Sequence, residues 1–326
     1  MKILQKSLLL AAATSIAITS PLLEAQGIKL TDELTVTGFI DMSLFLGDPD
    51  SGDSVESFGL DQFEIDFLYD FGKGLSAQVD LEYQDNGTGE EADIEQAFIT
   101  YSASDELSFK AGRFLSYTGW ETEEPTGLFQ FSGTGYAAFF YGGYQQGVSA
   151  KYSTPTYDLG ISLVNDLGDL EGEARDAGEL GVEVLAAVRP AKDWVVKAFY
   201  LTDELETGET SDLINIWGSY SPGPWTFAVE YNVSENAPAA GAGVDAEGFL
   251  LMGNYAWNKW GVTLRYHEWE LENAAGTTFQ DMSGITLAPS YTFGDNLLFV
   301  FEFRADEDDV GSDGGDAFAI EALLTF

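Results

Sequence analysis

The chain has 326 residues, and its 14 Lys and Arg against 55 Asp and Glu give a formal net charge of -41. A nucleic-acid-binding surface needs basic residues to displace counterions from phosphates, so this charge excludes a nucleic-acid partner. The sequence has no cysteine, which excludes disulfide scaffolds, thiol catalysis and thiolate zinc sites. Aromatic residues make up 14% of the chain, which separates it from disordered acidic proteins and indicates extensive apolar surfaces.

The N-terminus has the composition of a secretory signal peptide. A short basic region precedes an apolar run from Ser7 to Ile18, and Ala25 offers a small residue for cleavage. We therefore expect residues 1–25 to be removed and residues 26–326 to form a single domain. No later segment holds the ~18 consecutive apolar residues that a spanning helix needs, so we expect no transmembrane helix in the mature chain.

From Leu34 onward, apolar and polar residues alternate repeatedly, which is the period of a β-strand whose two faces lie in different environments. The segments 75–84 and 225–234 show the alternation best, and it falters around Phe98 and Trp217. With turn residues as boundaries, the pattern predicts about sixteen strands, or fourteen if two weak segments merge. The predicted strands are residues 34–46, 58–72, 74–84, 91–103, 106–115, 144–153, 156–166, 178–190, 192–204, 211–221, 223–234, 247–257, 259–271, 280–293, 295–306 and 315–326.

The predicted connections alternate between tight turns and longer loops. Tight turns such as residues 72–74, 190–191 and 258 occur at every second position and use Gly, Pro and Asn. The intervening connections are long, acidic and rich in glycine, and aromatic residues such as Trp225 and Trp260 occupy strand ends. These features are typical of an outer-membrane β-barrel, with turns in the periplasm and loops outside. A soluble antiparallel sheet is the alternative, but charges on the second face of successive segments argue against it.

Several stretches resemble known outer-membrane proteins. The segment 96–101, followed by 107–113 and a long loop, resembles the fourth and fifth strands of the Gram-negative general diffusion porins, in which a Gly-Arg pair precedes an inward-folded third loop. Residues 38–41 resemble the opening strand of such porins, and residues 119–121 are similar to a motif of a related, less characterised β-barrel porin group. The last strand, which ends at Phe326, looks like the C-terminal signal presented to the barrel-assembly machinery.

The resemblance implies a fold, a location and an assembly. The fold is an all-β transmembrane antiparallel β-barrel of about 16 strands, with the long third loop folded into the lumen. The location is the bacterial outer membrane, among lipid and lipopolysaccharide. The assembly is a homotrimer.

The loop over residues 116–143 is the predicted constriction of a pore. A barrel of ~16 strands leaves an aqueous channel unless something plugs it. The loop carries Glu121, Glu123 and Glu124, and its many aromatic residues can pack it against the wall. We expect the three glutamates to line the constriction. A solvated external cap is the alternative.

The resemblance also implies a basic wall opposite the loop. Arg113 matches the fifth-strand arginine of the family, but it shares the parity of outward Leu107 and Phe109, which requires a bulge or a strand end at Gly112. Alternation places five further basic or imidazole side chains in the lumen, namely Lys151, Lys197, Arg265, His267 and Arg304. Each could instead pair with a neighbouring lumenal acid.

Acidic residues outnumber these bases on the face assigned to the lumen. They are Asp41, Glu64, Asp66, Asp80, Glu82, Glu95, Asp158, Glu183, Glu230, Glu302 and Glu321. A narrow wet channel with a surplus of carboxylates concentrates cations. The sequence therefore predicts a cation-preferring channel for passive diffusion of small hydrophilic solutes and ions.

Two external loops are more acidic still. Their acids are Asp48, Asp50 and Asp53 in one loop, and Asp308, Asp309 and Asp313 in the other. Oxygen-rich loops that contain glycine suit Ca²⁺, although neither has the full EF-hand spacing. A solvating surface is the alternative, and we expect no other cofactor.

Two other functional classes are alternatives to a channel. An outer-membrane enzyme with Ser-His chemistry would have to use His267, the only histidine, and the sequence has no recognisable serine motif around it. We therefore expect no enzymatic activity. A closed barrel that serves adhesion or structural tethering is the second alternative, since the aromatic residues of the third loop are compatible with a blocked lumen.

Overall fold

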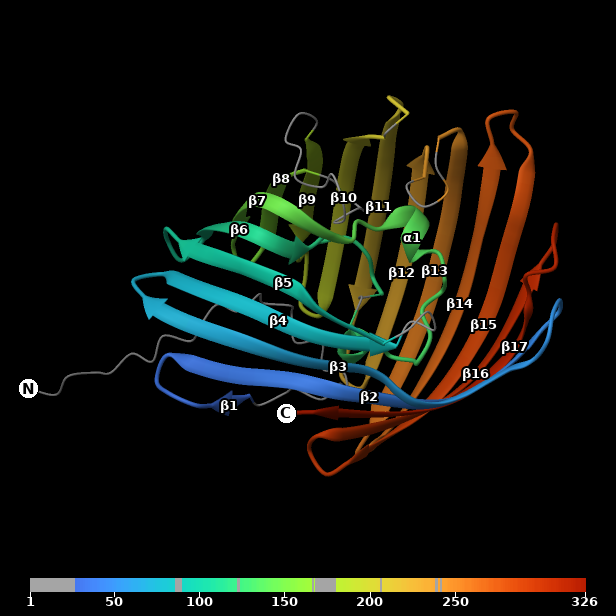
Figure 1. Ribbon diagram of the computed structural model, residues 1–326, viewed down its shortest axis with the longest axis horizontal. Helices are drawn as coiled ribbons and strands as arrows, with labels where there is room; N and C mark the ends of the chain where they lie inside the picture. The colour runs from blue at the N-terminus through green and yellow to red at the C-terminus, as the bar shows by residue number, and fades with distance from the viewer. Residues whose placement is uncertain are drawn as a thin grey trace, which may run out of the picture.

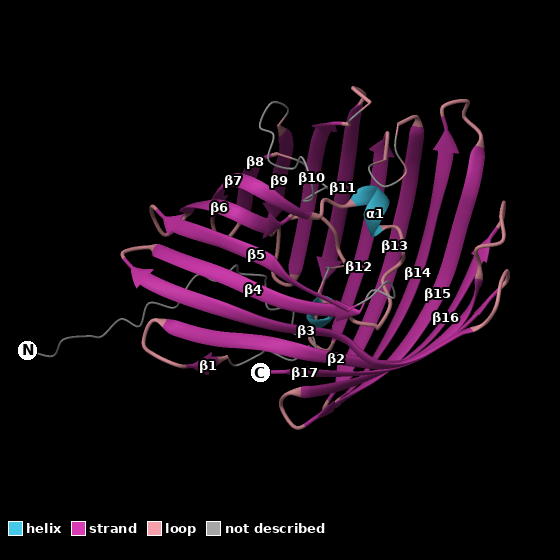
Figure 2. Cartoon of the chain, viewed as in Figure 1, coloured by secondary structure: helices cyan, strands magenta, loops and turns pink. Residues whose placement is uncertain are grey.

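A computed structural model describes residues 27–85, 90–121, 124–165, 167, 180–205, 207–237, 240 and 242–326. The predicted signal peptide, residues 1–25, lies outside the described residues. Strands form most of this part of the chain, as Figure 2 shows. They are β1 (Ile28–Lys29), β2 (Leu34–Pro49), β3 (Val55–Gly72), β4 (Leu75–Asp85), β5 (Glu90–Ser102), β6 (Leu107–Leu115), β7 (Tyr144–Ser153), β8 (Tyr157–Val164), β9 (Gly181–Val188), β10 (Trp194–Glu204), β11 (Thr210–Tyr220), β12 (Trp225–Glu235), β13 (Val244–Trp257), β14 (Trp260–Asn273), β15 (Thr278–Phe293), β16 (Leu297–Asp308) and β17 (Gly315–Thr325).

The sheet closes on itself into a barrel. Each strand from β2 to β17 pairs antiparallel with its sequence neighbour, and β17 pairs with β2 from Gly315↔Pro49 to Thr325↔Phe39. The backbones of Phe326 and Gly38 exchange hydrogen bonds of 3.0 and 3.1 Å, which extends this closing pair to the last residue. Closure removes the sheet edges, which would otherwise expose unpaired backbone groups. The predicted all-β barrel of sixteen strands is confirmed, with β1 added as a short pairing on β2.

Alternation along the strands separates an apolar outer face from a polar inner one. On β12, Phe227 and Val229 are exposed, whereas Ala228 between them and Thr226 and Glu230 on either side are buried. In a single barrel the outer face is open and the inner face is enclosed, so low exposure marks the lumenal side. The outward side chains are apolar in strand after strand, as an environment of hydrocarbon requires.

Aromatic side chains cluster near the turn end of the barrel. Ring centroids lie 4.4 Å apart for Trp225 and Tyr255, and 4.6 Å apart for Trp260 and Tyr291. Trp225 and Trp260 are exposed. Amphipathic aromatic rings favour the boundary between hydrocarbon and water, so this cluster matches an interfacial girdle.

The strand boundaries differ from the sequence prediction mainly at the loop end. There several strands run further, so that β2 and β3 are joined by residues 50–54, and β14 and β15 by residues 274–277, whereas β8 and β9 are shorter than predicted. The expectation that all connections at this end are long is therefore wrong. Ladder hydrogen bonds continue past the apolar band, into acidic stretches that the hydrophobic pattern does not mark as strand.

The two weak points of the alternation, Phe98 and Trp217, have a common explanation. Trp217 is buried within the main apolar cluster, and Phe98 packs against that cluster. This cluster lies inside the barrel, because most of its other members come from lumenal positions of β6 and of β8 to β15 and from the loop between β6 and β7. Apolar residues break the polar face of these strands because an apolar partner occupies the lumen there.

That partner is the segment 116–143, called here the inserted loop. It contains a 3-10 helix, η1 (Pro125–Gly127), and a short helix, α1 (Ala137–Phe140). Figure 1 shows it in green within the curve of the sheet, with α1 in front of β11 to β13. None of the described helices is long and apolar enough to cross a membrane.

Candidate pore and its inserted loop

The inserted loop leaves and rejoins the wall between two adjacent strands. Ser116 donates its backbone N–H to the Gly143 carbonyl at 3.0 Å, which closes the base of the loop. Gly119 has φ +92°, a conformation that costs an L side chain energy, and a Cβ there would lie 2.7 Å from Cζ of Tyr141. The chain can therefore turn sharply into the lumen at this position and pass close to an aromatic ring.

An ion pair fixes the middle of the inserted loop to the wall. Nη1 of Arg265, on β14, lies 2.5 Å from Oε1 of Glu121, and both side chains are buried. The same Nη1 donates to the Ser132 carbonyl at 2.5 Å, and Nη2 donates to the Thr286 hydroxyl at 2.9 Å. A loop acid thus meets a wall base, as the resemblance implies. The two charges are in direct contact and buried, and are not separated by the water of a pore. The role of Glu121 at the constriction stays a prediction.

Arg304, on β16, holds the neighbouring turn of the inserted loop. Its guanidinium donates to the carbonyls of Gly133 at 2.5 Å and Thr134 at 3.0 Å. Its Nε lies 2.6 Å from Asp306 on the same strand. Arg265 and Arg304 therefore act together, because both bind backbone carbonyls within residues 132–134. Arginine suits this role, since its planar fork offers several donors in a fixed geometry.

Glu230, on β12, accepts hydrogen bonds from several parts of the inserted loop. Its Oε1 accepts from the Trp120 backbone at 2.7 Å and from the Asn215 amide at 2.7 Å. Its Oε2 accepts from the hydroxyls of Tyr136 and Tyr141, each at 2.5 Å. Burial and the negative charge of Glu230 raise the pKa of both tyrosines well above the ordinary phenol value, so the phenols remain donors.

Two further wall carboxylates bind the backbone of the inserted loop. Glu183, on β9, accepts from the Ser116 hydroxyl at 2.6 Å and the Tyr117 backbone at 2.7 Å. Glu302, on β16, accepts from the Ser132 backbone at 3.0 Å. Charge-assisted hydrogen bonds of this kind are stronger than neutral ones. Acids of the wall therefore bind the loop backbone as well as contributing charge to the lumen.

Aromatic stacking completes the attachment of the inserted loop. The ring of Trp120 meets that of Trp217 edge to face, with centroids 5.3 Å apart, and stacks on Phe129 at 6.0 Å. Phe139, of α1, lies 5.3 Å from Trp269 on β14. Two of these pairs join an aromatic residue of the loop to one of the wall. They support the expectation that aromatic residues pack the loop against the wall.

The wall opposite this aromatic packing, formed by β2 to β5, is acidic. The predicted acids Asp41, Glu64 and Asp80 are buried on its inner face, and Asp66 and Glu82 are half-buried. Glu124 of the inserted loop reaches this wall, where carboxylate oxygens of Glu64, Glu95 and Glu124 lie within 4.8 Å of one another. Burial, together with the negative charges of Glu95 and Asp66, raises the pKa of the Glu124 carboxyl well above its ordinary value. Glu123 lies outside the described residues.

The described lumenal lysines lie on the side of β6 to β10, away from Arg265 and Arg304. Nζ of Lys197 lies 4.6 Å from the Trp217 ring, and Nζ of Lys151 lies 5.9 Å from the Tyr117 ring. The sequence interpretation missed Lys110, which is half-buried, with Nζ 4.3 Å from the Phe98 ring. Alternation places Phe109 on the outer face, so the same alternation could have placed the next residue, Lys110, in the lumen. Cations over aromatic faces are stabilised when they leave water.

Arg113 occupies the position at which the sequence demanded an irregularity. Gly112 has φ +136°, and a Cβ there would lie 2.7 Å from the Phe98 backbone. Arg113 lies 3.7 Å from Asp93, and its guanidinium is 6.0 Å from the Tyr144 ring. The Tyr144 hydroxyl in turn bonds to Glu95 in the lumen. The predicted bulge or strand end at Gly112 is not present, because β6 pairs with β5 and β7 in unbroken register through this position and continues to Leu115. The only irregularity is the positive φ of Gly112, and Arg113 lies at the edge of the acidic wall.

Carboxylates of the acidic external loops accept hydrogen bonds from groups within the same loops. The carboxylate of Asp308 accepts backbone hydrogen bonds from Val310 at 3.1 Å and Gly311 at 2.9 Å, and Asp48 accepts from the Ser54 hydroxyl at 3.0 Å. Within the described residues, no metal-sized group of three carboxylates includes any of the six loop acids Asp48, Asp50, Asp53, Asp308, Asp309 and Asp313. A calcium site in these loops stays an untested expectation.

His267 is fully buried between the two arginines of the wall. Its Nε2 lies 3.6 Å from Asp306, and no hydrogen bond to either ring nitrogen occurs among the described residues. Hydrogen bonds of the described serine hydroxyls go to other partners. Among the described residues, His267 therefore has no hydrogen bond to a serine hydroxyl of the kind that nucleophilic catalysis uses.

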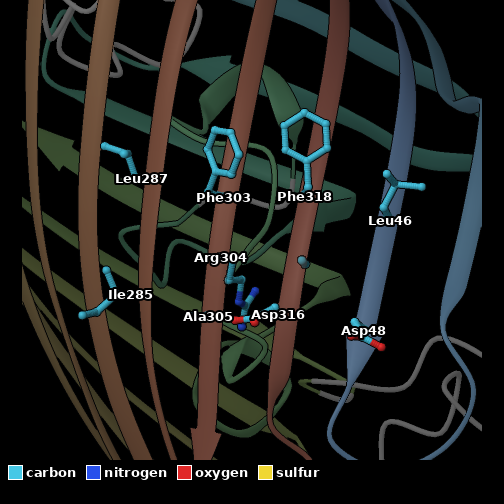
Figure 3. A pocket seen from close by; sticks show the side chains of 10 residues that line it. Leu46, Asp48, Ile285, Leu287, Phe303, Arg304, Ala305, Asp316 and Phe318 are labelled. Carbon is cyan, nitrogen blue, oxygen red and sulfur yellow. The ribbon is translucent and has the colours of Figure 1, made fainter.

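A separate hollow of about 630 Å³ lies on the outer face of the barrel, as Figure 3 shows. Its apolar lining comes from β15, β16, β17 and β2, and includes Leu287, Phe303, Phe318 and Leu46. Phe303 and Leu287 are exposed there, while the next residue of β16, Arg304, points inward to the inserted loop. This hollow faces the surroundings of the barrel and is separate from the lumen.

The closed sixteen-stranded barrel, its apolar outer face and the loop folded into a polar lumen together define a porin-like outer-membrane β-barrel. Residues 55–326 match the family described as "Putative beta-barrel porin-2, OmpL-like". The chain belongs to this family, whose members are channels of the bacterial outer membrane. No curated protein sequence matches the chain.

Solved structures with the same fold include several porins. The anion-selective porin from Comamonas acidovorans has a TM-score of 0.69 at 15% identity, with 90% of this chain and 99% of that chain covered. OmpF of Salmonella typhi, solved with daunomycin, has a TM-score of 0.69 at 15% identity, covering 90% and 97%. The trimer form of OmpT from Vibrio cholerae has a TM-score of 0.67 at 16% identity, covering 90% and 100%.

Proposed function

We propose that this protein forms a water-filled, cation-preferring channel for passive diffusion of small hydrophilic solutes and ions. The observation that carries the proposal is the acidic inner wall of β2 to β5, where Asp41, Glu64, Asp66, Asp80 and Glu82 all occupy lumenal positions. A narrow channel lined by carboxylates attracts cations and repels anions, because low-dielectric walls strengthen the field inside it.

The inserted loop supports a channel of fixed width. Buried arginines, wall carboxylates and aromatic pairs all bind residues 116–143, so the loop narrows the lumen without needing to move. We propose a homotrimer as the assembly, with the trimer form of Vibrio cholerae OmpT as the supporting precedent. We also propose that residues 26–326 act as one domain after removal of a signal peptide.

The test is the current through single channels in a planar bilayer under a salt gradient. Wild-type protein should give discrete steps and a reversal potential displaced toward that of the cation. Asp41→Asn combined with Glu82→Gln removes two lumenal charges and should reduce this displacement. The matched control, Asp48→Asn combined with Asp53→Asn, removes two exposed charges, at the end of β2 and in the connection that follows it, and should change the reversal potential little. An anion-directed reversal potential would contradict the cation preference.

A closed barrel for adhesion is a second candidate, favoured by the apolar cluster that fills part of the lumen. Correctly folded protein that gives no current steps and does not let liposomes swell would support it. Such a result would also contradict the diffusion channel.

A further inference from the structure

Five carboxylates gather in the lumen where the inserted loop meets the acidic wall. Oxygens of Glu64, Glu95 and Glu124 lie within 4.8 Å of one another, as do oxygens of Glu64, Asp66 and Asp80. Glu64 belongs to both groups. The set therefore joins β3, β4, β5 and the inserted loop at a single place, and we call it the carboxylate cluster.

The carboxylate cluster has buried oxygens without hydrogen-bond donors. Exposed fractions are 0% for Asp80, 3% for Glu95 and 5% for Glu64. Among the described residues, Oδ1 of Asp80 and the Oε2 atoms of Glu95 and Glu64 accept no hydrogen bond. In the same part of the chain, no Lys, Arg or His forms an ion pair with these three acids. Buried acids in this state are stabilised either by a bound cation or by keeping their protons, and the unpartnered oxygens are placed to bind a cation.

Neighbouring polar groups orient the cluster and leave particular oxygens available. The side-chain amides of Gln78 and Gln96 both donate to Oδ2 of Asp80 at 2.8 Å, which leaves Oδ1 available to a ligand. The Tyr144 hydroxyl bonds to Oε1 of Glu95, which leaves Oε2 available. Such outer partners fix ligand carboxylates in known metal sites.

We propose that the carboxylate cluster is a binding site for one calcium ion, with Glu64, Glu95 and Glu124 as ligands and Asp80 and Asp66 completing the site. All the donors are hard oxygens, which suit calcium, magnesium or manganese rather than zinc or copper. Calcium accepts six to eight oxygens in flexible geometry, whereas magnesium requires a near-ideal octahedron and retains its waters. A crowded group of carboxylates from four segments matches calcium better.

A calcium ion at this place would attach the inserted loop to the acidic wall. The other attachments of the loop, at Arg265, Arg304 and Glu230, lie on β12 to β16. Glu124 immediately precedes η1 and is the loop residue that reaches β3 and β5. The ion would therefore hold the loop across the lumen from both sides. It would also neutralise part of the charge that the proposed channel presents to solutes.

Calorimetric titration of calcium chloride into the folded, chelator-treated full chain in detergent tests the site. Terbium luminescence excited through tyrosine provides a second readout, because Tyr144 contacts the cluster. We expect one ion per chain, with affinity at least ~10-fold weaker in Glu64→Gln, Glu95→Gln and Glu124→Gln. The control Asp48→Asn combined with Asp53→Asn should bind as the wild type does.

Three outcomes would overturn the site: no binding of calcium, binding that Glu124→Gln and Glu64→Gln leave unchanged, or binding that only the external-loop control abolishes. Tighter binding of magnesium than of calcium would overturn the choice of ion. Glu124→Gln lies on the loop and not on a strand, so it remains informative if a strand variant fails to form an SDS-resistant barrel. The titration needs no open channel, so its failure is distinguishable from failure of the proposed diffusion function.

Discussion

Arg265 and Glu121 form a buried ion pair between the barrel wall and the inserted loop, with Nη1 and Oε1 2.5 Å apart. The side chain of Arg265 has no exposed surface, and that of Glu121 is 6% exposed. The two residues are far apart in the sequence, so their contact exists only because the loop folds back into the lumen. We therefore expect the position of the loop to be sensitive to substitution of either residue.

Removal of one member of this pair should destabilise the protein strongly. Arg265→Met leaves the Glu121 carboxylate buried without its partner, and such losses cost about 3–5 kcal/mol. The double variant Arg265→Met with Glu121→Gln should recover part of the loss, because no charge is then left uncompensated. Denaturant-dependent unfolding in detergent measures both effects. The control is Lys29→Met, which breaks an exposed pair with Asp32 and should have almost no effect. Equal stability of Arg265→Met and wild type would contradict the role of the pair.

Glu230→Gln should loosen the inserted loop. The carboxylate accepts four hydrogen bonds, whereas an amide has one acceptor oxygen and places its NH₂ group against donors. Each donor left without an acceptor costs about 1–3 kcal/mol. We expect faster proteolytic cleavage within residues 116–143 and noisier single-channel current. Glu235→Gln, an exposed change on the same strand, is the matched control and should behave as wild type. Unchanged cleavage in Glu230→Gln would show that the loop is held elsewhere.

Gly112→Ala should impair barrel stability. The backbone of Gly112 has φ +136°, and an added Cβ would lie 2.7 Å from Cα of Phe98 on the adjacent strand. An L side chain in such a conformation costs about 1–3 kcal/mol before the close contact is counted. The temperature at which the folded form loses its SDS-resistant mobility should fall. Gly59→Ala is the matched control, because a Cβ there meets no atom within 4 Å. A melting temperature for Gly112→Ala equal to that of Gly59→Ala would contradict the argument.

The docking of the inserted loop should weaken as pH rises in chelator-treated protein. Burial raises the pKa of Glu124 well above its ordinary value of 4.5, so the folded form keeps a proton that the unfolded form releases. The folded state therefore binds more protons, and the associated stability is complete below pH 4.5 and is lost as pH rises toward the folded pKa. Thermal unfolding measured from pH 4 to pH 9 should show this decline, and Glu124→Gln should reduce it. A decline that is equally steep in Glu124→Gln would assign the effect to other acids.

The predicted positions of the strands depended on local information. Within each hairpin, apolar and polar residues alternate with a period of two, and Gly, Pro and Asn mark the turns. The sixteen strands could therefore be predicted within a few residues. The same parity assigned Glu64, Asp80 and Arg265 to the lumen without knowledge of their partners. The parity conflict at Arg113 predicted a bulge or a strand end at Gly112, but β6 continues there in register and only the φ angle of Gly112 is unusual. Strand ends in acidic stretches escaped prediction, because ladder hydrogen bonds there continue without an apolar face.

The sequence by itself therefore determined the barrel, its apolar outer face and the long loop after Leu115, because each follows from short-range periodicity or from the length of one segment. Only the tertiary structure decided which lumenal charges meet. It paired Glu121 with Arg265, attached the inserted loop to Glu230, and brought Glu64, Glu95 and Glu124 together. The reason is geometric: barrel closure and the path of the loop set these distances, and parity specifies only the face on which a residue lies, not its neighbour across the lumen.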